Sequence, residues 1–305
     1  MSEVENGVSW LHRFGSLVAV MTFLLYLTGM LASSSGANLF TVRLGTSAPH
    51  PAGPSSKYLH AYDILAVTVI ALMIIFAFWL WRSDSRRYLK NLGTITVGIP
   101  IAMLLVLLSP APALFPAAVS VGYTLGIQSF FCLTVCLALF TRSDWRWDER
   151  KIPDLASPSM RQILVFTTTA VFVQPFLGEG FRDRTIGIAP HLVLGIAVTV
   201  CSLWVLEMAL TKFPHLRTFK ISAVFLAQVV GLQLFLGIIS YSMNLDARAA
   251  PGSHPGLMVI NVTHAAVGIL VLATSLFVAC QGFKYFAPSG SNDSPNMPDD
   301  FLSMK

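Results

Sequence analysis

The chain alternates between long apolar runs and short polar connections. A helix that crosses a lipid bilayer needs about 20 predominantly apolar residues. Eight runs approach or exceed this length, and the fifth, which is the shortest, can be extended by a turn at either end. They cover residues 15–33, 61–81, 92–109, 115–140, 163–178, 186–211, 221–243 and 257–283. The pattern predicts an all-α integral membrane protein with eight transmembrane helices.

The composition indicates the same class of protein. Hydrophobic residues make up 54% of the 305 residues and charged residues 11%, and the mean hydropathy is +0.68. Soluble proteins carry about 25% charged residues, so this chain has too few charges to cover a soluble surface. This excludes a soluble globular protein, a disordered chain, a coiled coil and a disulfide scaffold. The net charge of +5 has no polar face on which to form a nucleic-acid-binding patch.

Lysine and arginine are distributed unevenly over the connections. Fifteen of the 20 lie before the first run, after the last run, or in the connections 82–91, 141–162 and 212–220. Cytoplasmic loops of membrane proteins carry an excess of Lys and Arg, so both termini are predicted to lie in the cytoplasm and the protein in the cell (inner) membrane. Because Glu3 and Glu5 precede the first run, we interpret that run as a retained helix rather than a cleavable signal.

A polar connection, residues 142–162, divides the predicted helices into two groups of four. The N-terminal half covers residues 1–141 and the C-terminal half residues 163–286. The tail, residues 287–305, is rich in Pro, Ser, Asn and Asp and is predicted to be disordered.

The two halves resemble each other near the outer ends of their helices. The matching pairs are Gly29 with Gly178, His60 with His191, and Tyr123 with His264. Each half begins and ends on the same side of the membrane, as in a parallel repeat about an axis along the membrane normal. The fold class predicted is therefore two four-helix bundles related by internal duplication.

Two histidines lie inside predicted spans, where ionisable groups are costly and are functional candidates. His191 and His264 lie in the outer halves of their helices, and their depths differ by about 3 Å at 1.5 Å per residue. Neutral imidazole is the usual axial ligand of haem iron, and two such ligands give a six-coordinate electron-transfer haem. The pair therefore predicts a haem site. In the alternative interpretation, each histidine only forms a hydrogen bond to a neighbouring helix. A zinc site fits less well, because a closed zinc site needs four nitrogen or sulfur ligands and no others are at hand.

Further candidates lie on the same predicted side of the membrane. Arg182 and Arg184 would face the haem propionates, because Arg suits bidentate carboxylate binding, or they pair with nearby acidic residues in a solvated loop. His60 is predicted to face a tetrapyrrole in the N-terminal half or to lie at the membrane interface. Tyr123 has a phenol that could ligate iron or anchor its helix at the interface.

Four short segments carry a family resemblance through their order and spacing. They are LHRF at 11–14, GMLASSSG at 29–36, LQLFLG at 232–237, and the Thr263-His264 region. Together with the eight runs and the histidines near their outer ends, they make the chain resemble the haem A synthase family over residues 10–285.

Members of that family oxidise the C8 methyl of haem O to the formyl group of haem A, which supports assembly of terminal oxidases. The resemblance implies a haem b cofactor, with its iron between His191 and His264, and a haem O substrate site in the N-terminal half. His60 and Tyr123 would be the catalytic residues there, and His60 would also be an iron ligand. The partners implied are membrane lipid, haem O or another tetrapyrrole, haem O synthase and terminal oxidase subunits.

The chain departs from the family pattern in the N-terminal half. Where the family has Glu-x-x-His-Arg entering the second helix, Lys57 and Ala61 flank His60. Tyr123 stands where the family carries a histidine, and residues 34–60 lack the cysteine pair of many members. The departures leave open an alternative function. It is a non-catalytic haem b membrane protein for electron transfer or oxidase assembly, with a degenerate N-terminal site.

A transporter is the third class of function. Parallel repeats suit it, but transporters bind their substrates at helices broken near the bilayer midplane. Pro100 and Pro175 are the main candidates for such breaks.

Overall fold

The described elements are helices, apart from one isolated β-bridge between Ile152 and Phe286. The computed structural model of the chain describes residues 3–35, 54–114, 116–143, 145, 151–154, 157–182, 185–249 and 255–287. Its helices are α1 (Glu3–Ser34), α2 (Pro54–Ser83), α3 (Arg87–Leu108), α4 (Ala111–Leu114), α5 (Pro116–Phe140), α6 (Met160–Arg182), α7 (Ala189–Thr211), α8 (Arg217–Ala249) and α9 (Pro255–Tyr285). All except α4 are long and apolar enough to cross a membrane. The eight predicted spans are therefore confirmed as helices.

The helices extend beyond most of the apolar runs. α1 begins at Glu3 instead of residue 15, and α6 exceeds the run 163–178 by about a turn at its C-terminal end. A spanning segment must satisfy its backbone hydrogen bonds internally, so the helix continues into the polar residues at the membrane surface. Beyond Ala287, the predicted disordered tail lies outside the described residues.

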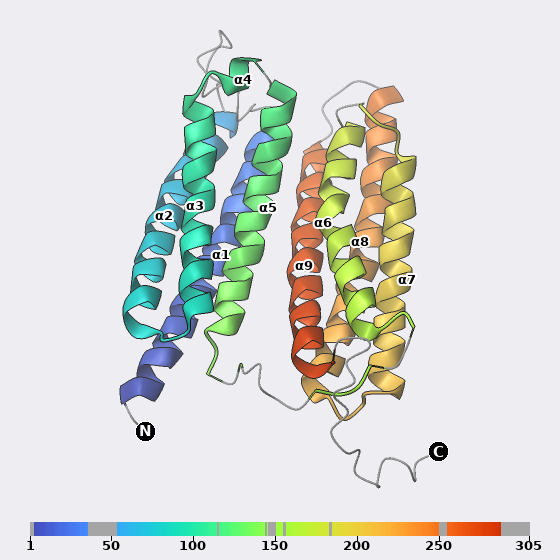
Figure 1. Cartoon of the computed structure of the whole chain (residues 1–305). Coiled ribbons are helices and arrows are strands. Elements are labelled where there is room, and N and C mark those ends of the chain that lie inside the picture. The colour runs from blue at the N-terminus through green and yellow to red at the C-terminus, as the bar shows by residue number, and fades with distance from the viewer. Residues whose placement is uncertain are drawn as a thin grey trace.

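Helix contacts divide the eight long helices into two rings of four. In the first ring α1 contacts α2, α2 contacts α3, α3 contacts α5 and α5 contacts α1; the second ring runs in the same way through α6, α7, α8 and α9. Figure 1 shows the two groups side by side, and they meet where α1 and α5 contact α9 and where α5 contacts α6. Within the described residues α2 makes no backbone contact with α5, nor α7 with α9. The helices of each of these two pairs therefore lie across a ring from each other.

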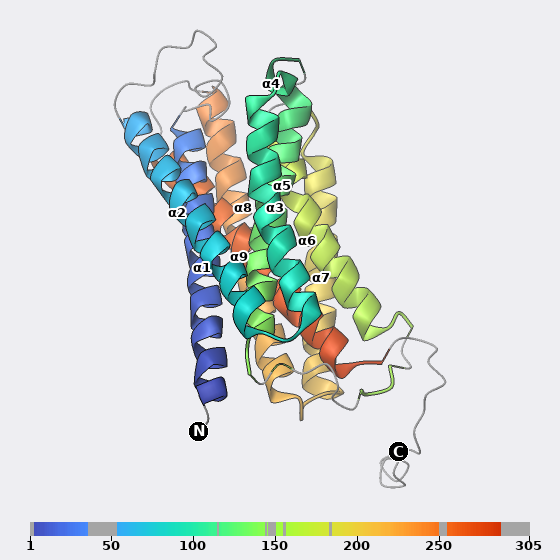
Figure 2. The same cartoon turned by 60° about the vertical axis from the view of Figure 1, so that its left-hand side comes forward.

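The long helices run along one common direction (Figure 2). The start of α1 and the end of α9 lie at the same end of the molecule, here called the terminal end (Figure 1). The opposite end, here called the loop end, carries α4 and the starts of α2, α7 and α9. Because α7 and α9 begin there, the residues of their first turns lie at the loop end.

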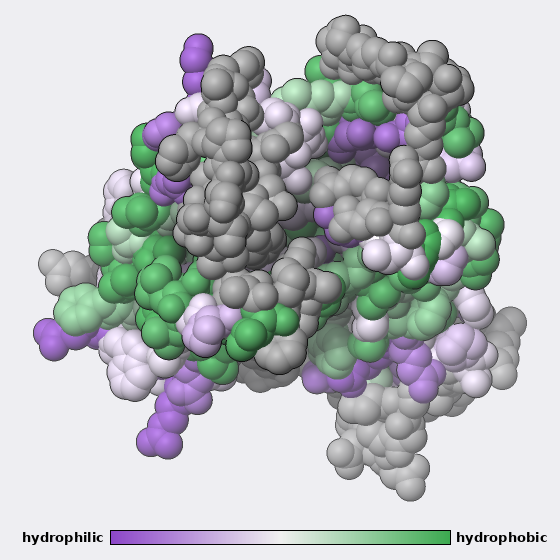
Figure 3. Space-filling model, turned by 90° about the horizontal axis from the view of Figure 1, so that it is seen from above, coloured by the Kyte–Doolittle hydropathy of each residue, from purple (hydrophilic) through white to green (hydrophobic). Residues whose placement is uncertain are grey.

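The outward faces of the helices are apolar. Large hydrophobic side chains such as Ile64, Val67 and Phe78 are each more than two-thirds exposed. Figure 3 shows hydrophobic residues along much of the rim of the molecule seen from the loop end. Such a surface is stable against lipid chains and unstable in water, in agreement with eight membrane-spanning helices.

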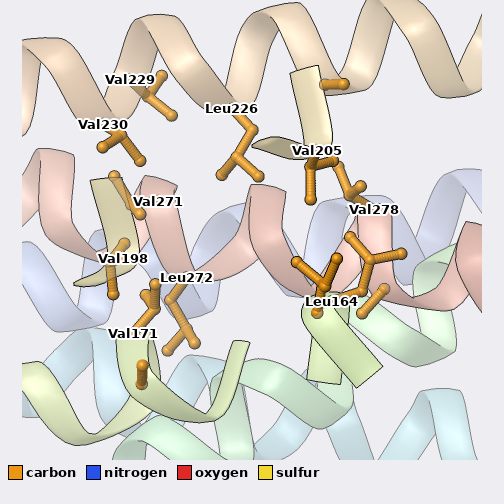
Figure 4. Packing of buried hydrophobic residues seen from close by; sticks show 14 of the residues in the cluster. Leu164, Val171, Val198, Val205, Leu226, Val229, Val230, Val271, Leu272 and Val278 are labelled. Carbon is orange, nitrogen blue, oxygen red and sulfur yellow. The ribbon is translucent and has the colours of Figure 1, made fainter. Parts of the chain in front are cut away.

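Branched aliphatic side chains fill the interior of the second ring. Figure 4 shows valine and leucine side chains from α6, α7, α8 and α9 pointing toward one another, among them Val171, Val198, Leu226 and Leu272. Lipid is as apolar as these side chains, so close van der Waals packing, rather than removal from water, holds such helices together. The packing sets the distance between the helices that carry His191 and His264.

Polar contacts fasten the terminal end of the first ring. The Arg86 guanidinium donates to the Phe140 carbonyl of α5 at 3.0 Å and pairs with Asp84 at 2.7 Å. Burial raises the pKa of the Asp84 carboxyl. The hydrogen bonds and the charge of Arg86 outweigh this effect, so the pKa of Asp84 lies below its ordinary value. His12, in the N-terminal third of α1, donates from Nδ1 to the Ala138 carbonyl at 2.7 Å. These contacts tie α1 and the α2–α3 turn to α5.

Neither candidate proline breaks its helix. Pro100 lies inside α3 and Pro175 inside α6, and both helices continue through them. The described spans thus lack, at these two positions, the broken helices on which transporter substrate sites are built.

Candidate functional site

His191 and His264 belong to helices that lie across the second ring from each other. His191 is the third residue of α7, and His264 lies in α9, both toward the loop end. Both side chains are half-buried, and they are close enough for a direct electrostatic interaction between the two imidazoles. Two helices without backbone contact thus present their imidazoles to the same space.

The His191 side chain packs against α6. Its Nδ1–H donates to the main-chain carbonyl of Gln174 at 3.3 Å, and the Gln174 carboxamide donates to the His191 carbonyl at 3.2 Å. The ring lies over Gly178: a Cβ added there would be 3.4 Å from His191 Cε1. The imidazole therefore packs closely against the α6 backbone at Gly178, at a distance that a Cβ would fill as an ordinary van der Waals contact.

The His264 side chain packs against α8 in a similar way. The Gln233 carboxamide nitrogen lies 3.3 Å from His264 Nε2 and donates to it. The ring lies over Gly237, where an added Cβ would be 3.1 Å from His264 Cε1. That distance is shorter than an ordinary van der Waals contact, so any larger residue here requires the imidazole to shift away from the α8 backbone.

The two helix hairpins share one sequence pattern that the initial reading of the sequence missed. Residues 174–178 read QPFLG and residues 233–237 read QLFLG, and each histidine is followed four residues later by a glycine, Gly195 or Gly268. Added Cβ atoms at these two glycines would meet the Gln174 and Gln233 carboxamides at 3.3 and 3.1 Å. Residues four apart lie on one helix face. In each hairpin the histidine therefore packs on the glycine of the preceding helix, and the glutamine of that helix packs on the glycine that follows the histidine. The repeated Gln-x-Phe-Leu-Gly is the sequence pattern that could have predicted the roles of Gln174 and Gln233.

Three polar atoms of this site are buried and lack a hydrogen-bond partner within the described part of the chain. They are Oε1 of Gln174, Oε1 of Gln233 and Nδ1 of His264. A buried polar group without a partner costs about 1–3 kcal/mol, so such groups are rare and concentrate at functional sites. The site therefore has unused donor and acceptor capacity around the imidazoles.

An amide cluster adjoins His264 on the loop side. Asn261, one turn before His264 in α9, accepts from the Ser240 hydroxyl at 2.7 Å and from the Asn244 carboxamide at 3.2 Å. Both donors belong to α8. The cluster therefore fixes the register of α8 against α9 beside His264.

In the first ring, two tyrosines meet across the centre. Tyr62 of α2 is 2% exposed, and its hydroxyl lies 2.5 Å from the hydroxyl of Tyr123 of α5. The Tyr62 ring lies over Gly29 of α1, where an added Cβ would be 3.1 Å from the ring. A glycine thus accommodates a ring from the next helix here as well.

His60 lies on the other side of α2. Its side chain is exposed, and its Nδ1–H donates to the Ser56 carbonyl one turn earlier at 2.7 Å. Residues two apart on a helix point about 200° apart, so His60 faces away from Tyr62. Consequently the structure does not bring His60 to Tyr123. Lys57, one turn before Ala61, is also exposed.

The predicted arginines are at the edge of the described chain. Arg182 is the last residue of α6, but its side chain and all of Arg184 lie outside the described residues. A role for them toward haem propionates stays a prediction.

The described residues contain no group of three or more His, Cys, Asp or Glu side chains able to hold a metal ion. A metal bound by protein side chains alone, such as structural zinc, needs such a group. A site with two protein ligands instead matches a metal whose other ligands come from a cofactor.

No protein-family model matches the chain, and no curated protein matches it either.

Proposed function

We propose that the protein is a membrane haem b protein in which His191 and His264 would hold the haem iron. The observation that carries this proposal is that His191 and His264, on helices that lie across the second ring from each other, are near enough to interact electrostatically, and each packs against a glycine of the preceding helix. Two axial imidazoles complete the coordination of a haem iron, so no third side-chain ligand is required. The polar and small residues around the pair support this use of the site.

The residues around His191 and His264 fit a haem. Ligating histidines usually donate their other ring N–H to an oxygen, which fixes the tautomer and ring orientation. His191 Nδ1–H already has such an acceptor in the Gln174 carbonyl. His264 Nδ1 is buried without one, while Gln233 beside it has a buried Oε1 without a donor. The Gln233 carboxamide lies against His264 Nε2. With that amide turned so that Oε1 accepts from Nε2–H, Gln233 would orient the ring and leave Nδ1 free to hold the iron.

The bound haem would supply one-electron transfer. The protein's own residues have three tasks: the two histidines hold the iron, Gly178 and Gly237 give the imidazoles room, and the apolar packing of the second ring keeps water away. A dry surrounding and the hydrogen bonds to the ligating imidazoles are the means by which a protein adjusts a haem potential.

Oxidation of haem O to haem A is the second candidate function. The resemblance over residues 10–285 favours it, with the substrate in the N-terminal half. Against it stand the outward direction of His60, the exposed Lys57 and the contact of Tyr62 with Tyr123. We therefore favour the non-catalytic alternative, electron transfer or support of oxidase assembly, with terminal oxidase subunits as partners.

The same helix order in the two rings supports the proposal that the bundles arose by duplication. Along the chain, α1, α2, α3 and α5 would correspond to α6, α7, α8 and α9. In both rings the second and the fourth helix lie across from each other. The helices that carry His191 and His264 then correspond to those that carry Tyr62 and Tyr123.

The purified protein is expected to carry about one low-spin haem b per chain, because two strong-field imidazoles complete the iron coordination. Haem extraction and an optical spectrum of the detergent-solubilised protein measure the type, the number and the spin state. A preparation from a haem-replete host that lacks a haem band contradicts the proposal. Haem A in the membranes of a synthase-deleted host, when this chain is supplied, would favour the second candidate.

The terminal end is expected to face the cytoplasm, because 15 of the 20 Lys and Arg residues belong to that side. A reporter that is active only in the cytoplasm is fused after Lys305, and a second copy is fused in the connection between α7 and α8. Both fusions should be active. Activity of a periplasmic reporter at the same two points instead would reverse the orientation.

A further inference from the structure

We infer that Tyr62 and Tyr123 occupy, in the first ring, the positions that His191 and His264 occupy in the second. The first ring consequently holds no haem by axial histidines, but becomes able to hold one when both tyrosines are replaced by histidine. This inference rests on the proposed function of the second ring. It replaces His60 by Tyr62 as the counterpart of His191.

The glycine contacts carry the first step. Gly29 of α1, Gly178 of α6 and Gly237 of α8 each lie beneath a ring of the following long helix. These rings belong to Tyr62, His191 and His264. Since Gly29 and Gly178 end equivalent helices, the ring over Gly29 corresponds to the ring over Gly178. That ring belongs to Tyr62.

The ring topology carries the second step. α2 and α5 lie across the first ring, as α7 and α9 lie across the second. The hydroxyls of Tyr62 and Tyr123 are in contact between the first pair of helices, and His191 and His264 are near enough to interact electrostatically between the second pair. Tyr123 already matches His264 by its place in the repeat, so both members of each pair correspond.

The hydroxyl distance carries the third step. First-row metals bind nitrogen and oxygen ligands at about 2 Å, so two ligand atoms on opposite sides of a metal lie about 4 Å apart. The two hydroxyl oxygens are 2.5 Å apart. Neutral imidazole, by contrast, is the usual protein ligand of haem iron. The tyrosine pair is therefore a hydrogen-bonded bridge between α2 and α5 and not a pair of iron ligands.

The test counts haems in the full-length protein purified from a haem-replete host. The unmodified chain should carry about one haem, and the Tyr62→His/Tyr123→His variant about two, both low-spin. Tyr62→Phe/Tyr123→Phe is the matched control. It removes the same hydrogen bond without supplying imidazoles and should stay at one. His60→Ala should also stay at one.

The outcomes separate this inference from the proposed function. Two haems in the unmodified chain, or loss of a haem in His60→Ala, overturns the inference. A double-histidine variant that keeps its first haem, and is thus folded, but gains no second one also overturns it. An unmodified chain without haem refutes the function of the second ring. Even then, a gain of one haem in the double-histidine variant would support the correspondence.

Discussion

Alanine at His191 or at His264 is expected to abolish the low-spin haem spectrum. Each substitution removes one of two axial ligands, and no other His, Cys, Asp or Glu joins the pair within the described residues. Loss of a group that merely orients a metal ligand lowers metal affinity by about 10–100-fold, so loss of the ligand itself should exceed about 100-fold. Haem retained through size-exclusion chromatography, with the optical and electron paramagnetic resonance spectra, measures the effect.

His215→Ala is the control for this pair. His215 is exposed in the turn between α7 and α8 at the terminal end, far along α7 from His191. Its removal also deletes an imidazole but should leave haem content and spin state unchanged. A His191→Ala or His264→Ala protein with the unmodified spectrum would refute axial ligation by that residue.

Valine at Gly237 is expected to expel the haem although it changes no ligand. A Cβ at this position would lie 3.1 Å from His264 Cε1, and the two methyl groups of valine require still more room. The imidazole must then leave the α8 backbone and lose its alignment with the iron. We expect at least about a tenfold loss of bound haem, in the range found when the groups that orient metal ligands are removed.

Gly231→Val on the same helix is the matched control. An added Cβ there meets no atom within 4 Å, and the residue is exposed. Both variants change the helix propensity of α8 in the same way, so only Gly237→Val should lose haem. Equal haem content in the two proteins would mean that the contact between Gly237 and His264 has no role in binding.

Sequence reasoning reached part of the site. The depths of His191 and His264 follow from their distances to the ends of apolar runs, because helix rise per residue is constant. Gln174 and Gln233 were missed because a single glutamine in a span resembles an ordinary interhelical hydrogen-bond donor. Their role becomes visible only when each is seen opposite a glycine on the next helix, four residues after the histidine.

Tyr62 illustrates the limit of sequence reasoning most clearly. The sequence pairs His60 with His191 because both are histidines near the start of the second helix of a half. Tyr62 is only two residues away, yet the helix turns it to the opposite side and into contact with Tyr123. A residue count predicts depth to within a turn, but it does not predict the direction of a side chain.

By itself, the sequence determined that the chain forms eight membrane-spanning helices, because length and hydropathy alone decide whether a segment is stable in lipid. It also determined the depth of each polar residue. The tertiary structure decided how each helix is rotated about its axis. In lipid the outward and inward faces of a span are both apolar, so the hydrophobic pattern carries little information about rotation. Contacts such as Gly29 with Tyr62 and Gly237 with His264 set the rotation, and they exist only once the helices are packed.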